Sequence, residues 1–157
     1  MPETQKTLET MAEEIFEIYQ LMATLRSRQT SGQEDISETE YITLNVLARG
    51  GQMTVGEVQK RIGVAPAQMS RIVRALEENG GRGYVECQIN PRDRRCVDIS
   101  LTAAGRKAHA RFRAARLESM YAFLSVLPPE DRVHFMRIIG QIRGAFEQRL
   151  ALAMAQE

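Results

Sequence analysis

The segment from Asn90 to Arg95 carries the most informative chemistry of the chain. Three guanidinium groups, from Arg92, Arg94 and Arg95, lie within four residues and surround Asp93. The Asn-Pro pair that opens the segment is typical of a turn. Arginines on a narrow projecting turn suit the minor groove of A·T-rich duplex DNA, where negative potential is concentrated. The alternative interpretation is a solvated charged turn.

Asp93 needs a separate explanation, because phosphate groups would repel its carboxylate. We therefore expect no direct contact between Asp93 and a nucleic acid. A charge-assisted hydrogen bond that holds a neighbouring guanidinium in one orientation is the role we predict for it.

Residues 66–79 form the second candidate site, on a predicted helix. At 100° per residue, Met69, Ile72, Val73 and Leu76 share one narrow apolar sector that should face a core. The remaining surface carries small, amide, hydroxyl and guanidinium side chains, which are the types that contact base edges and phosphates in a major groove: Ala67, Gln68, Ser70, Arg71 and Arg74. An amphipathic helix with a merely charged outer face is the alternative.

Local signals predict the elements that position these side chains. Residues 37–40 (Ser-Glu-Thr-Glu) form a capping box that begins a helix, which runs to about Arg49. Residues 54–57 (Thr-Val-Gly-Glu) form a second capping box, for a short helix that ends near Gly63. Pro66 fits the first turn of the next helix, which stops at Gly80-Gly81. Two helices joined by a short turn with glycine make a helix–turn–helix.

Two strands are predicted around the arginine-rich turn, over residues 84–89 and 96–101. Val97, Ile99 and Leu101 alternate with polar residues, which is typical of a half-buried strand. Thr102 can cap a long helix that reaches about Val126, and the Pro-Pro pair at 128–129 interrupts it.

The terminal helices carry long apolar stripes. Leu8, Met11, Ile15, Ile18, Met22 and Leu25 recur at steps of three and four residues, before a polar break at 30–35. The last helix presents Phe135, Ile139, Ile142, Phe146 and Leu150 on one side. One small subunit should not leave this much apolar surface in water, so we expect the stripes to form a homodimer.

Composition agrees with a nucleic-acid partner. Residues 1–40 contain 3 basic and 9 acidic side chains, whereas residues 41–95 contain 9 and 5, so the basic groups concentrate in the middle. The absence of Trp argues against single-strand binding by stacking. We expect no membrane span and no secretory signal, and the 2 cysteines favour a reducing cytoplasm.

Taken together, residues 54–80, the Asp-Arg-Arg sequence at 93–95 and the Leu-Thr-x-x-Gly sequence at 101–105 resemble the winged helix–turn–helix of MarR-type transcriptional regulators. The order and lengths of the flanking helices also match, so the resemblance covers nearly the whole chain. It implies a mainly α fold with a small β-hairpin wing. It also implies one MarR-like domain over 1–157, with dimerisation helices at about 5–30 and 103–152 and the winged helix–turn–helix at about 37–102.

The resemblance also implies function. A dimeric repressor would bind a pseudo-palindromic double-stranded operator and would be released by a small ligand or an oxidant. The predicted DNA-binding set adds Thr54 to the helix and wing residues, and Arg94 or Arg95 would enter the minor groove. The sequence departs from the family at Gly80-Gly81-Arg82-Gly83, where the extra glycines should loosen the attachment of the wing.

The remaining candidate chemistry comprises redox, metal and catalytic sites. A hairpin centred on Pro91–Arg92 would bring Cys87 nearly opposite Cys96, so a reversible disulfide is conceivable, although two reduced thiols are favoured. Arg94 and Arg95 could lower the pKa of Cys96. We expect no metal site, cofactor or enzymatic activity, because no ligand cluster, phosphate loop or nucleophile–base pattern is found. A winged helix that binds a protein partner instead of DNA is the main rival function.

Overall fold

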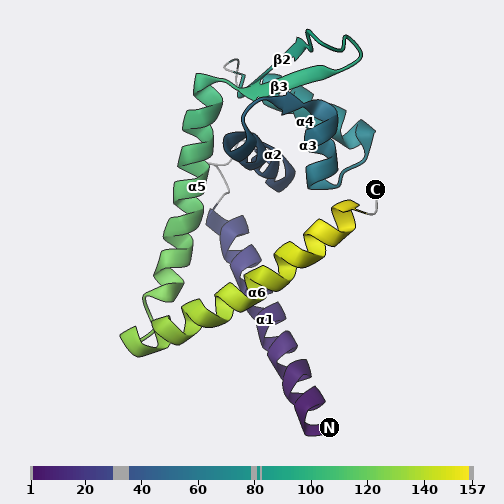
Figure 1. The fold of residues 1–157 in the computed structure, drawn as a ribbon. Helices are drawn as coiled ribbons and strands as arrows, with labels where there is room; N and C mark the ends of the chain where they lie inside the picture. Colours follow the sequence, from purple (N-terminus) through teal and green to yellow (C-terminus); the bar gives the residue numbers. More distant parts are fainter. Residues whose placement is uncertain (1, 30–35, 79–80, 82, 156–157) are drawn as a thin grey trace. The chain divides into compact units, whose positions relative to one another are not determined.

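The computed structural model describes residues 2–29, 36–78, 81 and 83–155 (Figure 1). The chain divides into two compact units, residues 1–35 and residues 36–157. The described residues of the first unit form helix α1 (Pro2–Gln29). Its predicted apolar stripe is exposed, with Leu8 at 61% and Ile15 at 58%. The predicted break at 30–35 lies outside the described residues.

Both predicted capping boxes are confirmed in the second unit. Ser37 caps α2 (Glu38–Gly50) together with Glu40, and Thr54 caps α3 (Val55–Ile62) together with Glu57. Both helices end at a glycine with positive φ, Gly51 at 73° and Gly63 at 69°. Because L side chains avoid this region, glycine is the residue that ends both helices without strain.

Helix α4 (Pro66–Glu78) follows and packs on the core through Met69, Ile72 and Leu76, as predicted. Val73 is only half-buried. The core also takes side chains from α2, α3, the sheet and the start of α5, chiefly Leu44, Leu47, Val58, Val85, Ile99, Leu101 and Phe112. A single apolar cluster therefore supports the helix–turn–helix and the base of the hairpin.

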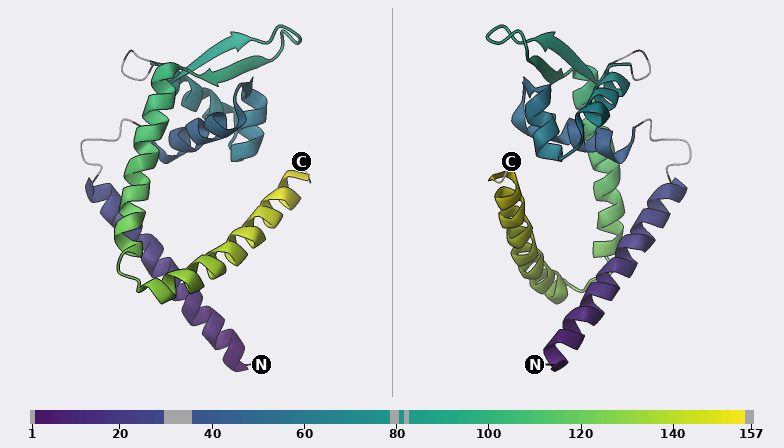
Figure 2. Two further views of the ribbon diagram at one scale, coloured as in Figure 1. Left: turned by 60° about the vertical axis from the view of Figure 1, so that its left-hand side comes forward. Right: turned by 90° about the vertical axis from the view of Figure 1, so that its right-hand side faces the viewer.

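The antiparallel sheet has the strand order β1-β3-β2, with β1 (Met53–Thr54), β2 (Val85–Ile89) and β3 (Val97–Leu101). β1 was not predicted, because two residues show no periodicity and they pair with a strand far along the sequence. Strands β2 and β3 form a hairpin that projects past α3 and α4 in all three ribbon views (Figures 1 and 2). Val97, predicted to be buried, is 42% exposed because the outer hairpin extends beyond the core.

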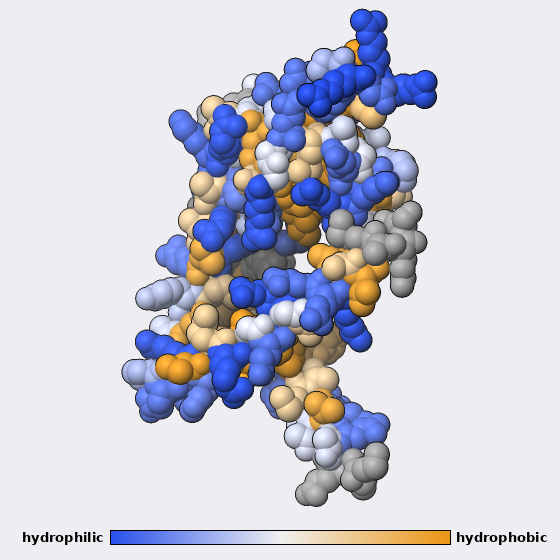
Figure 3. All heavy atoms as spheres, viewed as in Figure 1, coloured by the Kyte–Doolittle hydropathy of each residue, from blue (hydrophilic) through white to orange (hydrophobic). Residues whose placement is uncertain are grey.

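The second unit ends with α5 (Ala103–Leu124) and α6 (Pro129–Ala155). Thr102 caps α5 by accepting a hydrogen bond from the backbone N–H of Gly105, at 2.9 Å. On α6 the apolar stripe is exposed, with Phe146 at 67% and Leu150 at 57%, and Figure 3 shows orange patches among hydrophilic side chains there. Within the described ranges no helix combines the length and apolar character that crossing a membrane requires.

Candidate nucleic-acid interface

Helix α4 presents the predicted polar surface to solvent. Ala67, Gln68, Ser70, Arg71 and Arg74 are all exposed, while the buried residues fix the opposite side of the helix. Ser70 Oγ donates a hydrogen bond to the carbonyl O of Pro66 at 3.1 Å, so its lone pairs remain as acceptors. The helix thus offers amide and hydroxyl groups in its first turns, with the guanidinium groups of Arg71 and Arg74 following them towards the C-terminus.

Thr54, at the start of α3, uses its polar atoms within the chain. Its Oγ1 accepts from the N–H of Glu57 at 3.1 Å and donates to Glu57 Oε2 at 2.8 Å, and its own N–H donates to the same carboxylate at 2.7 Å. These hydrogen bonds hold the pKa of Glu57 below its usual value. Thr54 is therefore engaged in capping, and its predicted contact with DNA stays a prediction.

The arginine-rich turn is held by backbone hydrogen bonds to two short side chains. Asn90 Oδ1 accepts from the N–H groups of Arg92, at 2.9 Å, and Asp93, at 3.0 Å. Asp93 Oδ1 in turn accepts from the N–H of Arg95 at 3.0 Å. The three arginines are exposed, and Figure 3 shows hydrophilic side chains gathered at the hairpin tip. These hydrogen bonds fix the backbone of the turn, and the guanidinium groups of its three arginines are exposed to solvent.

The role predicted for Asp93 needs correction. Its carboxylate binds the backbone N–H of Arg95 and lies 3.6 Å from Cys96 Sγ. Among the described residues it forms no ion pair with a neighbouring guanidinium. A short aspartate side chain can accept a hydrogen bond from the backbone N–H two residues later with little loss of conformational entropy. An ion pair with an arginine would cost more, because the long arginine side chain would be immobilised. Asp93 therefore stabilises the backbone of the turn and does not orient an arginine side chain.

The predicted placement of Cys87 nearly opposite Cys96 is wrong, and the alternative of a disulfide between them loses its geometric basis. The strand register places Cys87 opposite Ile99 and Ile89 opposite Val97, so the hairpin is centred near Asp93. Cys96 precedes β3 and lies three residues before Ile99, about 10 Å at strand rise, whereas a disulfide tolerates a Cα separation of only about 7 Å. Both cysteines are free thiols.

The environments of both thiols raise their pKa, and for Cys96 this is opposite to the prediction. Burial raises the pKa of Cys87 to about 12, and the negative charge of Glu77 acts in the same direction. Partial desolvation and the carboxylate of Asp93 raise the pKa of Cys96. The expected lowering by Arg94 and Arg95 is therefore absent, and the Asp93 carboxylate, 3.6 Å from Cys96 Sγ, acts in the opposite direction. Neither thiol is favoured as a thiolate nucleophile.

The base of the wing is joined to the neighbouring helices by hydrogen bonds. Gly80 and Arg82, in the segment predicted to loosen this attachment, lie outside the described residues, and the loosening stays a prediction. Tyr84 N–H donates to the carbonyl O of Leu76 at 2.7 Å, which joins the hairpin to the end of α4. Thr102 Oγ1 donates to the carbonyl O of Gly83 at 2.7 Å, and Thr102 N–H donates to Tyr84 O at 3.1 Å. Gly105 packs against the Tyr84 carbonyl so closely that a Cβ would overlap it. These contacts fix the hairpin to both α4 and α5.

Asp98 is a residue that the sequence analysis missed. The alternation of Val97, Ile99 and Leu101 with polar residues predicts that position 98 faces solvent, yet Asp98 is 5% exposed. Its carboxylate accepts from Gln52 Nε2 at 2.9 Å and from Asn90 Nδ2 at 2.8 Å. The signal that could have found it is a short acidic side chain at the centre of a predicted strand, where β-propensity is poor. Its burial depends on β1, which was also missed.

A polar cluster joins α2 to α5. The rings of Tyr41 and His109 stack at 5.9 Å between centroids, and Arg116 Cζ lies 3.7 Å from the Tyr41 centroid. Arg116 also forms an ion pair with Glu38 at 3.0 Å. His109 Nε2 lies 3.2 Å from Asn45 Oδ1. Burial lowers the pKa of His109 below its ordinary value of 6.5, and the nearby Arg113 and Arg49 add to this effect.

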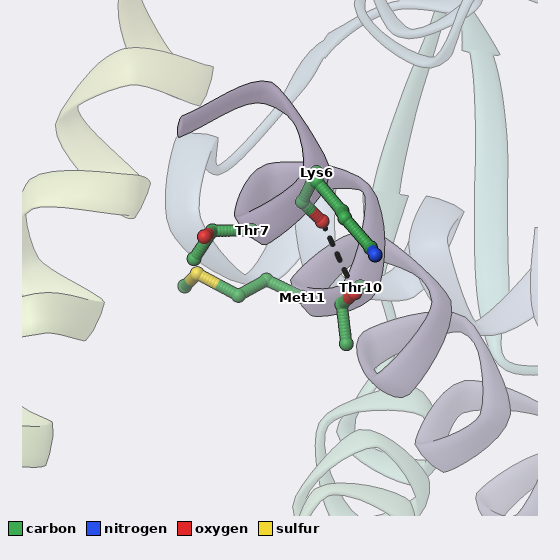
Figure 4. Close-up of a pocket in the computed structure, with 4 residues that line it drawn as sticks. All are labelled: Lys6, Thr7, Thr10 and Met11. Atoms are coloured by element: carbon green, nitrogen blue, oxygen red, sulfur yellow. Dashed lines mark hydrogen bonds between the residues drawn. The ribbon is translucent and has the colours of Figure 1, made fainter. Parts of the chain in front are cut away.

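Two shallow hollows occur on the described surface. One lies on α1 between Lys6, Thr7, Thr10 and Met11, where Thr10 Oγ1 donates to the Lys6 carbonyl at 3.1 Å (Figure 4). The other lies between Tyr84 and the first half of α5, beside Lys107 and Arg111. Neither shows the enclosed apolar lining expected of a ligand pocket, so we assign the predicted effector to neither of them. No group of three metal-ligating side chains is found among the described residues.

The fold and the exposed residues of α4 and the hairpin define a winged helix–turn–helix protein. A family model described as the MarR family matches residues 36–97. The HTH-type transcriptional regulator MT0903.1 of Mycobacterium tuberculosis is 30% identical over 115 residues, which is 73% of this chain and 77% of that protein. The HTH-type transcriptional repressor MdtR of Bacillus subtilis is 25% identical over 114 residues, 73% and 72% of the two chains. The chain belongs to the MarR family of HTH-type transcriptional regulators.

Solved structures share the fold. A MarR family protein from Bacillus stearothermophilus has a TM-score of 0.76 at 21% identity, covering 91% of this chain and 97% of its own. Streptococcus pneumoniae FabT, solved in complex with DNA, has a TM-score of 0.69 at 20% identity, covering 89% and 97%. The predicted mainly α fold with a small β-hairpin wing is confirmed.

Proposed function

We propose that this chain is a homodimeric, sequence-specific repressor that binds a pseudo-palindromic operator in duplex DNA. The observation that carries the proposal is that α4 and the wing, fixed to one core, both present exposed arginines. In a winged helix–turn–helix, these elements are suited to the major and the minor groove. The solved FabT–DNA complex and the name of the repressor MdtR support this assignment.

The dimer and the effector belong to the same proposal. We assign the exposed stripes of about 5–30 and 103–152 to a two-fold interface, and residues 37–102 to DNA binding within one functional domain. PcaV of Streptomyces coelicolor has been solved in complex with its natural ligand, which supports control by a small molecule here. The protein would act in the cytoplasm through binding rather than catalysis.

Selection of bound sequences from a random duplex pool tests the proposal directly. The expected result is one enriched inverted repeat whose half-sites lie about one helical turn apart, roughly 34–36 Å. Affinity for that sequence should fall steeply with salt, because phosphate contacts release counterions. The opposite result is that no sequence is enriched and that the affinity for DNA is weak and independent of salt concentration. This result would support the rival role of a protein-interaction module.

Variants of α4 then test which groove contacts specify the sequence. Arg71→Ala and Arg74→Ala should each weaken operator binding, by about 1–3 kcal/mol where the arginine binds guanine in a bidentate manner. An arginine that reads a base should relax the selected sequence at one position, whereas one that binds phosphate should weaken all duplexes alike. If both variants bind the operator with unchanged affinity, α4 does not contact the major groove through these arginines.

A further inference from the structure

The outer half of the wing is not held by the apolar core. Ile89 and Val97 face each other across the hairpin and are 67% and 42% exposed. Core packing ends nearer the base, at Val85 and Ile99. Something other than apolar packing must therefore fix the position of the tip and its arginines.

Buried Asp98 supplies this connection. Its two carboxylate oxygens accept hydrogen bonds from different parts of the fold, Gln52 just before β1 and Asn90 at the start of the turn. Because β1 leads directly into α3, the carboxylate links the wing to the helix–turn–helix. A buried carboxylate is unfavourable unless its acceptors are satisfied, and here two neutral amides satisfy them.

The bond from Asn90 to Asp98 also determines which way the Asn90 amide points. Asn90 Nδ2 donates to Asp98, and this leaves Oδ1 to accept from the backbone N–H groups of Arg92 and Asp93. A reversed amide would place its NH₂ group against two other donors. Asp98 thus orients Asn90, and Asn90 shapes the turn that carries the arginines.

We propose that Asp98 is a positioning residue for DNA binding, which acts through Asn90 to fix the wing arginines relative to α4. The inference rests on the proposed function, because it assigns the wing arginines to a DNA contact. Asp98 itself does not touch DNA. Its effect on affinity should appear only through Arg94 and Arg95.

The first test measures the turn without DNA. Amide hydrogen exchange at Arg92 and Asp93 should be about tenfold faster in Asp98→Ala, which removes both acceptors. Asp98→Asn should exchange like the wild type: its oxygen can accept from Asn90, and its NH₂ can donate to Gln52 once that exposed amide turns. Ser100→Ala is the matched control, because it removes a hydrogen bond to Glu86 from the same strand without reaching the turn.

The second test is a double-mutant cycle on operator affinity. Removal of the groove-binding arginine, by Arg94→Ala or Arg95→Ala, should weaken binding about tenfold in the wild type and only about twofold in the Asp98→Ala background. Arg71→Ala should have the same effect in both backgrounds, which excludes a general folding defect. Asp98→Val is a second variant, since valine favours strands and cannot accept a hydrogen bond.

The outcomes separate the two proposals. If exchange at Arg92 and Asp93 is unchanged in Asp98→Ala and Asp98→Val, the positioning role is wrong. Equal losses from the arginine variants in both backgrounds would also overturn it, while operator binding by the wild type would leave the proposed function intact. A wild-type chain that selects no duplex would overturn the proposed function, and the positioning role with it.

Discussion

At the scale of single residues, Asp93 combines two opposing effects. Its charge repels phosphate, while its Oδ1 holds the N–H of Arg95 at 3.0 Å. Asp93→Asn keeps an acceptor and removes the charge, so we expect tighter binding to duplex DNA, most clearly at low salt. Asp93→Ala also loses the hydrogen bond, worth about 0.5–1.5 kcal/mol, and should bind less tightly than Asp93→Asn.

Fluorescence titrations with a labelled operator at several salt concentrations measure both Asp93 variants. Asp93→Ala should also lose part of the preference for A·T pairs where the wing reaches the DNA. Equal affinity and equal sequence preference for the two variants would show that the hydrogen bond to Arg95 has no role in binding.

The cysteines give a second prediction at this scale. Because Cys87 lies opposite Ile99, mild oxidation should form no disulfide between Cys87 and Cys96 within one chain. Differential alkylation followed by mass spectrometry measures this, with Cys87→Ser as the control. Recovery of a peptide pair linked through Cys87 and Cys96 from the native protein would contradict the observed register.

At the scale of elements, the contact between α2 and α5 should depend on pH. His109 has a folded-state pKa below 6.5, so the unfolded chain binds more protons when the pH falls through that value. The free energy of unfolding is therefore expected to be highest above about pH 6.5 and to decrease as the solution is acidified towards the folded-state pKa. Denaturant unfolding at a series of pH values measures this slope.

Two variants check the origin of the slope. His109→Gln should flatten it, and Arg113→Gln should reduce it in part, because the positive charge of Arg113 helps to lower the pKa of His109. His109→Gln that retains the full slope between pH 5 and 7 would assign the pH dependence to other groups.

Local signals in the sequence predicted most element boundaries. The boxes at Ser37 and Thr54 and the helix end at Gly63 follow from interactions within four residues, so they could be predicted without the fold. β1 and the burial of Asp98 depend on pairing between Met53 and Ile99, which are distant in sequence. The centre of the hairpin was misplaced because Pro91 was taken as its tip, whereas the side chains of Asn90 and Asp93 stabilise a longer turn.

The same distinction applies to the candidate site. The exposed positions of α4 could be read from a helical wheel, because burial of Met69, Ile72 and Leu76 fixes the opposite side. The hydrogen-bonding partner of Asp93 could not be predicted from the sequence, because a carboxylate near several donors can bind either a side chain or the backbone. Only the geometry of the turn decides between them.

At the scale of the whole molecule, the proposed dimer depends on the stripe of α6. Ile142→Glu places a charge within the stripe and should shift the protein towards monomer, because an unpaired buried charge is strongly unfavourable. Gln141→Glu adds the same charge off the stripe and is the matched control. Sedimentation velocity at micromolar concentration measures the shift, and a wild type that is already monomeric there would contradict the proposed dimer.

The close approach of Gly105 to the Tyr84 carbonyl has a consequence for sequence divergence. No side chain can be accommodated at position 105 without moving the joint between hairpin and helix, whereas a Cβ at Gly140 or Gly144 would meet open space. Homologous sequences should therefore keep glycine at position 105, whereas contacts within the chain place no such restriction on positions 140 and 144. At position 105, the carbonyl oxygen of Tyr84 is by itself close enough to exclude every side chain.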